Sequence, residues 1–272
     1  MKLSKLSRVL EEPPFRLLSY FLVKRLAKSI RTINRWGAVD RPNYLAGLLA
    51  AAELAKADGL KEISAIEFGV AGGSGLVAMQ DYARLVEEQT DVKIAVFGFD
   101  TGEGLPKLCG DFRDHPDQWL PSDYKMDVPK LQARLAPRTR LVLGNITATL
   151  PQFIASAHPA VGFVAVDVDL YSSTKDVLKL FTLPGKRALR RVFMYFDDID
   201  FVFNHRFAGE WLAIDEFNRE SADVKIDRWR GLRKDRVFND SPWIDKMFIA
   251  HDLAAISRYE NARSQSDGCA LT

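Results

Sequence analysis

The fold of this chain is decided by a glycine-rich stretch, Glu67-Phe68-Gly69-Val70-Ala71-Gly72-Gly73-Ser74-Gly75. An apolar run at residues 63–68 precedes it and predicts a strand, and the amphipathic pattern over residues 74–88 predicts a helix. Glycines let the backbone turn sharply and approach a ligand closely. In an open α/β sheet, ligands bind at the carboxyl ends of the strands. The stretch therefore predicts a small-molecule site at a strand-to-helix turn.

The rest of the chain alternates between predicted strands and predicted helices. Strands are expected at residues 93–99, 140–143, 161–168, 191–196, 224–229 and 246–250, and helices at 43–57, 128–135, 147–157, 173–181 and 207–220. This alternation implies right-handed βαβ units and a sheet covered by helices on both faces. The expected fold is therefore α/β and Rossmann-like, with seven mostly parallel strands. Residues 101–126 are too irregular for a tight connection and are expected to form a lid or substrate loop.

The chain is expected to divide into a basic amphipathic helical extension at residues 1–41, a main domain at residues 42–260 and a flexible tail at residues 261–272. The extension holds ten Lys/Arg and three acids. Apolar residues at three- to four-residue steps predict one helix over residues 14–36. Packing of this helix on the domain or across a homo-oligomer is favoured. The alternative is peripheral contact with an anionic membrane surface, which would suit a lipid-linked sugar as substrate.

Composition excludes several classes of protein. Hydrophobic residues make up 47% of the 272, enough for a substantial core, so wholesale disorder is excluded. A formal net charge of +2 gives no electrostatic case for binding nucleic acid. The two cysteines fit neither a disulfide framework nor a zinc signature, and no secretory signal or membrane-spanning run is evident. We therefore expect a cytoplasmic protein, with membrane association through residues 14–36 as the variant.

The glycine-rich stretch fits S-adenosylmethionine better than a dinucleotide or a nucleoside triphosphate. Gly69 does not begin the spacing of a dinucleotide fingerprint, and no Gly-Lys-Ser/Thr of a P-loop follows. Glu67 adds an acid at the strand end, which can attract the cationic sulfonium or the amino group of S-adenosylmethionine. Gly69, Val70, Gly73 and Ser74 are the candidates for the turn that holds this cofactor. The alternative is a tight strand-to-helix turn without a ligand.

Two further strand ends carry side chains suited to a nucleoside. Asp100 ends the second predicted strand and can accept hydrogen bonds from both ribose hydroxyls. Asn145 follows the third strand, where its side chain or the neighbouring backbone can contact adenine. The alternative is that an acid at a strand end is only a turn former or a helix cap.

Four aspartates follow the fourth and fifth predicted strands: Asp167, Asp169, Asp197 and Asp198. Neighbouring parallel strands lie about 4.8 Å apart, so the carboxylates are expected at one edge of the sheet. Such like charges need compensation, and Mg²⁺, a hard divalent ion that prefers oxygen ligands, would supply it. A competing interpretation is that Asp169 or Ser172 caps the helix that follows. Strand alternation would also point Asp197 and Asp198 apart.

Five motifs follow one another along the chain: Glu67-x-Gly69-Val70-x-x-Gly73, Phe99-Asp100-Thr101-x-x-Gly104-Leu105-Pro106, Thr149-Leu150-Pro151, Asp167-x-Asp169-Leu170-Tyr171-x-Ser173-Thr174 and Asp197-Asp198. Together they resemble the macrocin/mycinamicin-type sugar O-methyltransferases, over about residues 42–250. The resemblance implies a class I methyltransferase fold with S-adenosylmethionine and Mg²⁺ as cofactors. The chain departs from the family at Ile199, at residues 184–190 and in its basic N-terminal arm.

The resemblance also implies roles for individual residues. Asp167, Asp197 and Asp198 match the metal ligands, and Asp169 matches the general base. Thr101 and Asp167 fall among the residues expected beside the cofactor. The acceptor implied by the resemblance is a hydroxyl of a deoxysugar in a natural product.

The expected function is transfer of a methyl group to a hydroxyl of a sugar-like or glycosylated small molecule. Mg²⁺ would chelate two vicinal oxygens and lower the pKa of the acceptor hydroxyl, and Asp169 would take the proton. Two alternatives remain open. One is a methyltransferase without metal in which His205, the best placed of four histidines, is the base. The other is a methyltransferase-like binding protein without catalysis.

Overall fold

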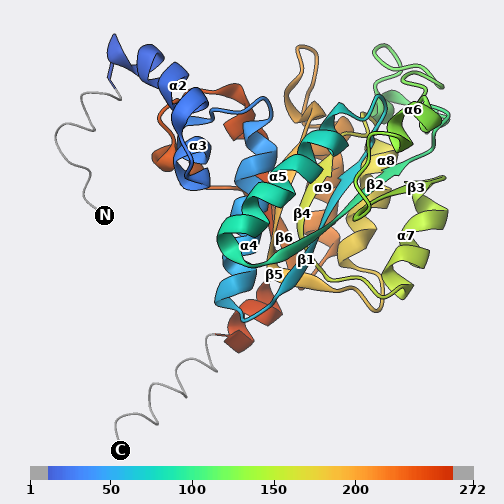
Figure 1. The fold of residues 1–272 in the computed structure, drawn as a ribbon. Coiled ribbons are helices and arrows are strands. Elements are labelled where there is room, and N and C mark those ends of the chain that lie inside the picture. The colour runs from blue at the N-terminus through green and yellow to red at the C-terminus, as the bar shows by residue number, and fades with distance from the viewer. Residues whose placement is uncertain (1–11, 260–272) are drawn as a thin grey trace, which may run out of the picture.

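A seven-stranded sheet forms the centre of the protein, whose computed structural model describes residues 12–259 (Figure 1). The order of the strands is β3-β2-β1-β4-β5-β7-β6. Neighbours within β1–β5 are parallel, and β7 is antiparallel to both β5 and β6. The bounds are β1 (Glu62–Phe68), β2 (Lys93–Asp100), β3 (Thr139–Leu143), β4 (Ala160–Val166), β5 (Ala188–Phe196), β6 (Val224–Arg228) and β7 (Met247–Asp252). This topology confirms the predicted Rossmann-like, class I methyltransferase fold.

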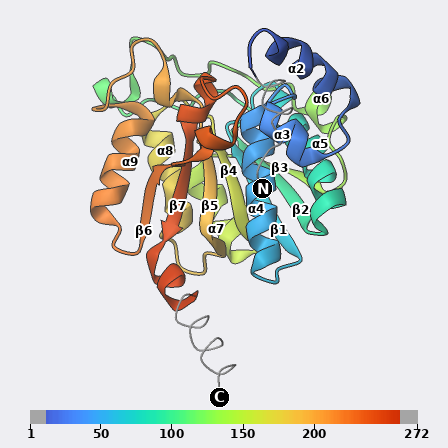
Figure 2. The same cartoon turned by 90° about the vertical axis from the view of Figure 1, so that its left-hand side faces the viewer.

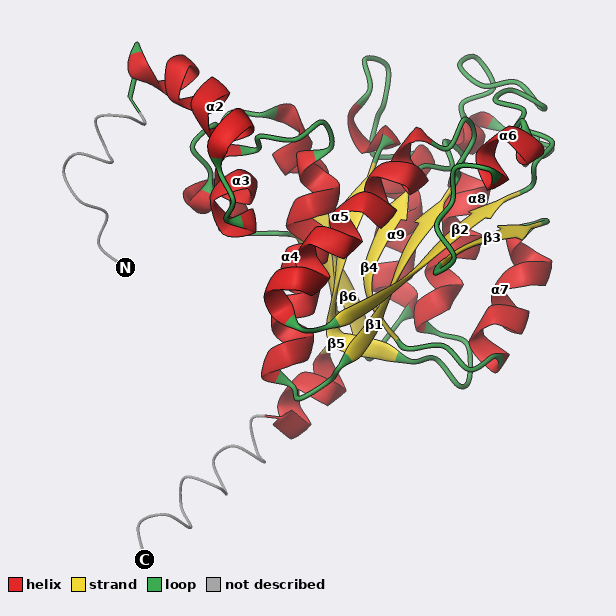
Figure 3. Cartoon of the chain, viewed as in Figure 1, coloured by secondary structure: helices red, strands yellow, loops and turns green. Residues whose placement is uncertain are grey.

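Helices cover both faces of the sheet, as the alternation of elements predicts (Figure 3). One face packs against α4 (Pro42–Ala57) and α5 (Ser74–Thr90), and the other against α7 (Ile146–Ala155), α8 (Tyr171–Leu178) and α9 (Gly209–Glu220). Within β1, Ile63 and Ala65 belong to the first core and Ile66 and Phe68 to the second. Glu67 therefore faces α4, because side chains alternate along a strand.

Helix α4 is part of the main domain and packs closely on the sheet. Tyr44, Leu45 and Leu48 are fully buried. A Cβ on Gly47 would lie 2.2 Å from the ring of Phe163 in β4, so only glycine permits this approach. The predicted start of the domain near residue 42 coincides with the first residue of this helix.

The prediction of one helix over residues 14–36 is wrong in one respect. The segment forms two helices, α2 (Phe15–Leu26) and α3 (Ile30–Trp36), separated by residues 27–29 with extended backbone at Ala27 and Ser29. The break lets α3 turn Ile30, only 2% exposed, into the main core. The Arg236 guanidinium donates a hydrogen bond to Asn34 Oδ1 at 2.8 Å and ties α3 to the segment between β6 and β7.

Two of the expected regions fall partly or wholly outside the described residues. These are residues 1–11 of the basic extension and the tail at residues 261–272. Within residues 12–259, no helix is both long and apolar enough to cross a bilayer.

The connection over residues 101–126 is largely irregular, as predicted, and is held by one buried acid. Asp114 lies in a short 3₁₀ turn, Phe112–Asp114. Its carboxylate accepts hydrogen bonds from the N–H of Cys109 and from the N–H and hydroxyl of Ser172 at the start of α8. The connection then enters α6 (Val128–Gln132), which is shorter than the predicted helix at residues 128–135.

Candidate cofactor and metal site

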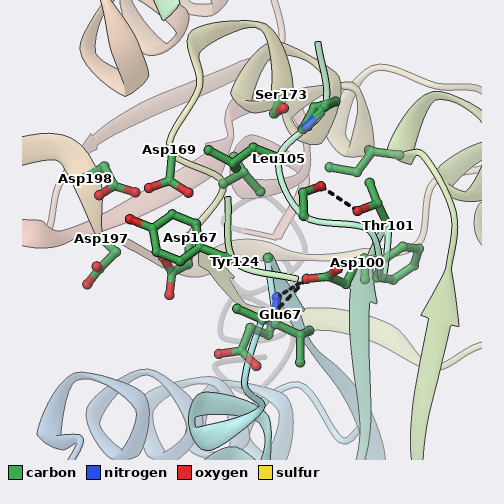
Figure 4. A pocket seen from close by; sticks show the side chains of 18 of the residues that line it. Glu67, Asp100, Thr101, Leu105, Tyr124, Asp167, Asp169, Ser173, Asp197 and Asp198 are labelled. Atoms are coloured by element: carbon green, nitrogen blue, oxygen red, sulfur yellow. Dashed lines mark hydrogen bonds between the residues drawn. The ribbon is translucent and has the colours of Figure 1, made fainter. Parts of the chain in front are cut away.

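A cavity of about 510 Å³ opens at the carboxyl ends of β1, β2, β3, β4 and β5 (Figure 4). Most of the sequence-predicted site residues line it: Glu67, Gly69, Val70, Ser74, Asp100, Thr101, Asn145, Asp167, Asp169, Asp197 and Asp198. Two predicted site residues, Gly73 and His205, do not line the cavity. Its volume lies within the range of about 300–1,000 Å³ that is usual for small-molecule sites.

The glycine-rich turn is compact because β1 and β4 approach each other where it begins. Gly69 has φ +83°, and a Cβ there would lie 1.6 Å from the carbonyl oxygen of Asp167. Gly75 stands over Glu67, since a Cβ on Gly75 would lie 1.9 Å from Glu67 Oε1. Gly73 precedes α5 with φ +77° and faces Leu131, away from the cavity wall. Gly69 is required by backbone geometry before any ligand is considered, since its Cβ would meet backbone rather than the end of a side chain.

Glu67 is a buried acid at one end of the cavity. It is 2% exposed, and its Oε1 accepts a hydrogen bond of 2.6 Å from the hydroxyl of Tyr44. Its Oε2 has no hydrogen-bond partner among residues 12–259. Burial, together with the nearby charge of Asp167, raises the pKa of Glu67 to about 8, against the lowering effect of the Tyr44 hydrogen bond. A cationic group in the cavity would satisfy this acceptor.

The side chains expected to bind the nucleoside also hold the loops. Asp100 Oδ2 accepts hydrogen bonds from the N–H groups of Val70 and Ala71 at 2.8 and 2.9 Å, and Oδ1 accepts one from Gly102. Asn145 caps α7, with its side-chain oxygen accepting from the N–H of Thr147. Asp100 therefore joins the glycine-rich turn to the end of β2, and it also lines the cavity.

The four aspartates of β4 and β5 meet at the other end of the cavity (Figure 4). One carboxylate oxygen from each of Asp167, Asp197 and Asp198 lies within 4.8 Å of the others. The expectation that Asp197 and Asp198 point apart is wrong, because the strand ends at Phe196. Asp197 has helical backbone angles and begins a 3₁₀ turn, so strand alternation does not apply to it.

Asp169 lies beside these three in a strained turn. Its φ is +60°, and the N–H of Leu170 donates to the carbonyl of Val168, which closes a three-residue turn around it. Such turns with positive φ are rare and strained, and strain of this kind gathers at functional sites. Leu170 takes the capping position of α8, which has no side-chain cap, so neither Asp169 nor Ser172 caps that helix.

The electrostatics of the aspartates call for a cation. Burial, then the charges of Asp197 and Asp198, raises the pKa of Asp167 to about 8. Burial, then Asp167 and Asp197, raises the pKa of Asp169 to about 7. Asp198 Oδ2 is buried without a hydrogen-bond partner among the described residues. Three converging carboxylates with an unsatisfied oxygen fit a hard divalent cation such as Mg²⁺.

Other groups near the cluster were not found from the sequence. The hydroxyl of Tyr195 donates a hydrogen bond to Asp197 Oδ1, and Lys246 Nζ donates to the carbonyl of Asp197. Glu210, at the start of α9, is fully buried, and burial and the charge of Asp198 raise its pKa well above the ordinary value. Arg41 lines the cavity and donates to the hydroxyl of Ser74. Acids are common in the first turn of a helix, so the sequence does not distinguish Glu210 from an ordinary exposed acid at that position.

His205 is exposed in the loop that precedes α9 and lies outside the cavity wall. Its ring centroid is 5.1 Å from that of His115, and its N–H donates to Asn204 Oδ1. His115 packs in turn on Phe201, with ring centroids 5.1 Å apart. In this arrangement His205 contacts His115 in the connection over residues 101–126, whereas Asp169 lines the cavity itself.

No protein-family model and no curated protein matches this chain. Solved structures resemble it, among them the calicheamicin methyltransferase CalS11, with 18% identity, a TM-score of 0.49, and coverage of 92% of this chain and 98% of that one. An apo structure of CalS11, described as a TDP-rhamnose 3'-O-methyltransferase, has 17% identity, a TM-score of 0.44, and coverage of 92% and 96%. The plantazolicin methyltransferase BpumL, solved with a pentazolic analogue and SAH, has 11% identity, a TM-score of 0.37, and coverage of 90% and 94%. These likenesses concern the fold.

Proposed function

We propose that this protein is an S-adenosylmethionine-dependent O-methyltransferase that acts on a hydroxyl of a sugar-like small molecule and uses Mg²⁺. The observation that carries the proposal is the division of one cavity into two ends. Glu67, Asp100 and the glycine-rich turn form one end, and four aspartates form the other. The first end suits a cationic nucleoside, and the second suits a metal and a hydroxyl acceptor.

The residues at the first end would orient the methyl donor. Glu67 offers a buried, unsatisfied oxygen to the positive charge of the donor. Asp100 and Asn145 stand on the wall where ribose and adenine would lie. When bound, S-adenosylmethionine supplies an electrophilic methyl group on a sulfonium. Holding the two reactants in line supplies much of the rate.

Asp167, Asp197 and Asp198 would hold Mg²⁺, which when bound supplies a Lewis acid for the acceptor oxygens. Asp169 lines the cavity beside this cluster and would accept the proton of the acceptor hydroxyl. The rings of Trp119 and Tyr124, with centroids 6.5 Å apart, stand on the same wall and would offer apolar faces to a sugar ring.

The test is methyl transfer from radiolabelled S-adenosylmethionine to a panel of glycosides and nucleotide sugars. We expect Asp169→Asn to lower kcat by about 10²–10⁴, the usual contribution of a general base. Asparagine tolerates positive φ, so the fold and the affinity for S-adenosylhomocysteine should be retained. Asp176→Asn is the matched control, because Asp176 lines the cavity outside the cluster. Wild-type turnover by Asp169→Asn would show that Asp169 is not the base.

The same assay separates the alternatives. EDTA should silence the enzyme, and activity that survives EDTA would favour the metal-independent mechanism. A large loss in His205→Gln with little loss in Asp169→Asn would transfer the role of base to His205. If calorimetry detects no binding of S-adenosylmethionine, the protein is a binding module without this chemistry.

A further inference from the structure

Helix α2 presents its apolar side chains to solvent. Phe15, Leu17, Leu18, Phe21, Leu22 and Leu26 are each between 49% and 68% exposed. The inward face of the same helix carries Ser19, Tyr20 and Val23, which pack toward Trp36, Val237 and Phe238. An outward row of six large apolar residues on one 12-residue helix is unusual, and such patches mark binding surfaces.

Two loops add exposed apolar residues at the same level of the molecule. Residues 112–124 contribute Leu120 and Tyr124, and residues 201–207 contribute Val202, Phe203 and Phe207. Figures 1 and 2 agree that α2 and these two loops form the upper edge, beyond the carboxyl ends of the parallel strands. We call α2 with residues 112–124 and 201–207 the apolar edge. The cavity opens on this edge, because Trp119 and Tyr124 belong to both.

Positive charge accompanies the apolar residues of α2. Arg25 is exposed and follows Leu18, Phe21 and Leu22 by seven, four and three residues, which puts it on the same outward face of α2. Lys28 follows the end of the helix and is also exposed. Neither makes an ion pair with another residue of 12–259, whereas Lys24 and Arg31 pair with Asp40 and Glu53. The sequence before α2 adds Lys2, Lys5 and Arg8.

From this combination we propose that the apolar edge docks on an anionic lipid bilayer. Leucine and phenylalanine insert at the boundary of headgroups and acyl chains, and arginine and lysine reach the lipid phosphates. A seam between two copies would instead bury Arg25 among apolar side chains, where an unpaired charge is costly. The bilayer also contacts three segments that are far apart in sequence but level with one another. Docking of this kind brings the mouth of the cavity to the membrane surface.

The test is flotation of the full chain with vesicles of phosphatidylcholine alone and of phosphatidylcholine mixed with phosphatidylglycerol. The protein should float with the mixed vesicles and less with the neutral ones. Leu18→Ser with Leu22→Ser should abolish flotation. Arg25→Gln with Lys28→Gln should weaken it at least about fivefold, in line with the effect of single basic residues near anionic lipid. None of these measurements needs methyl transfer, so the result does not depend on the proposed activity.

Leu60→Ser with Leu253→Ser is the matched control. Both leucines are exposed, and they lie at the opposite edge of the sheet, before β1 and after β7. This variant should float like the wild type. Absence of flotation of the wild type with mixed vesicles would overturn the proposal, as would equal flotation of the two leucine variants. A dimer in solution that Leu18→Ser with Leu22→Ser converts to a monomer, without flotation, would assign the edge to a second copy.

Discussion

Among the glycines of the described residues, Gly69 leaves the least room for a side chain. Its φ of +83° is rarely adopted by other residues, and a Cβ would overlap the carbonyl of Asp167. Gly69→Ala should therefore lower the free energy of unfolding by about 2 kcal/mol or more. Gly72→Ala is the control, because a Cβ there meets nothing within 4 Å among the described residues. Equal urea midpoints for the two variants would contradict this account of the turn.

Glu67 should make stability depend on pH. Its pKa rises on folding from 4.5 to about 8, so between these values the folded chain holds a proton that the unfolded chain has lost. The contribution of Glu67 to stability is therefore present at low pH and falls as pH rises through this window. Glu67→Gln removes the dependence and keeps an acceptor for Tyr44.

The measurement is urea unfolding of both proteins at pH 5 and pH 8, without metal or cofactor. Relative to the wild type, Glu67→Gln should be more stable at pH 8 than at pH 5 by at least about 1.4 kcal/mol, the equivalent of one pKa unit. Acids that do not interact with Glu67 titrate alike in both proteins and cancel in the comparison. Parallel pH profiles would mean that Glu67 does not hold a proton in the fold.

Sequence reasoning located most of the wall of the cavity because strand ends are predictable. Asp100, Asp167 and Asp169 each follow a buried apolar strand, and parallel strands end at one edge. Asp197 and Asp198 were harder, since their orientation depends on where β5 gives way to a 3₁₀ turn. Glu210 was missed, because its burial results from packing between α9 and the cluster.

At the scale of elements, the two N-terminal helices should differ in how much they stabilise the main domain, because α3 reaches the core and α2 does not. Deletion of residues 1–27 removes α2 and should change Tm by only a few degrees. Deletion of residues 1–41 also removes Ile30 and Trp36 from their cores and exposes Val237. Losses of this kind cost about 2–5 kcal/mol for each large buried side chain. Differential scanning calorimetry of both truncations checks this, and equal Tm values would place the boundary at residue 42.

The break between α2 and α3 shows what periodicity leaves out. Leu26, Ile30 and Ile33 continue one helical pattern in the sequence, so a single helix was the natural prediction. The structure interrupts the helix because Ile30 must reach the core while the apolar side of α2 faces outward. The spacing of apolar residues predicts a helical face, but it does not predict whether each turn of the helix packs on the core or faces solvent.

At the scale of the molecule, the parallel half of the sheet follows from right-handed connections between short strands. The insertion of β7 between β5 and β6 could not be derived this way, since strands predicted at residues 224–229 and 246–250 do not say which of them pairs with β5. Their connection, residues 229–246, is much longer than a hairpin turn and carries the contacts to α3.

Ligands of the cavity should stabilise the whole domain. S-adenosylhomocysteine at about 100 times its Kd should add about 2.7 kcal/mol to the free energy of unfolding. For a domain of this size that raises Tm by about 5–10 °C. Mg²⁺ should raise Tm further in the wild type and not in Asp198→Asn. A Tm that is indifferent to Mg²⁺ in both proteins would remove the metal from the proposed site.

The strained turn at Asp169 has a consequence for the range of sequences that this position can accept. A backbone with φ of +60° costs less for glycine, asparagine and aspartate than for other residues, and it costs most for β-branched side chains. In a library of all substitutions at position 169, selection for folding should enrich glycine, asparagine and aspartate. Selection for methyl transfer should retain aspartate alone. The position thus separates two requirements on one side chain: tolerance of a positive φ and acceptance of a proton.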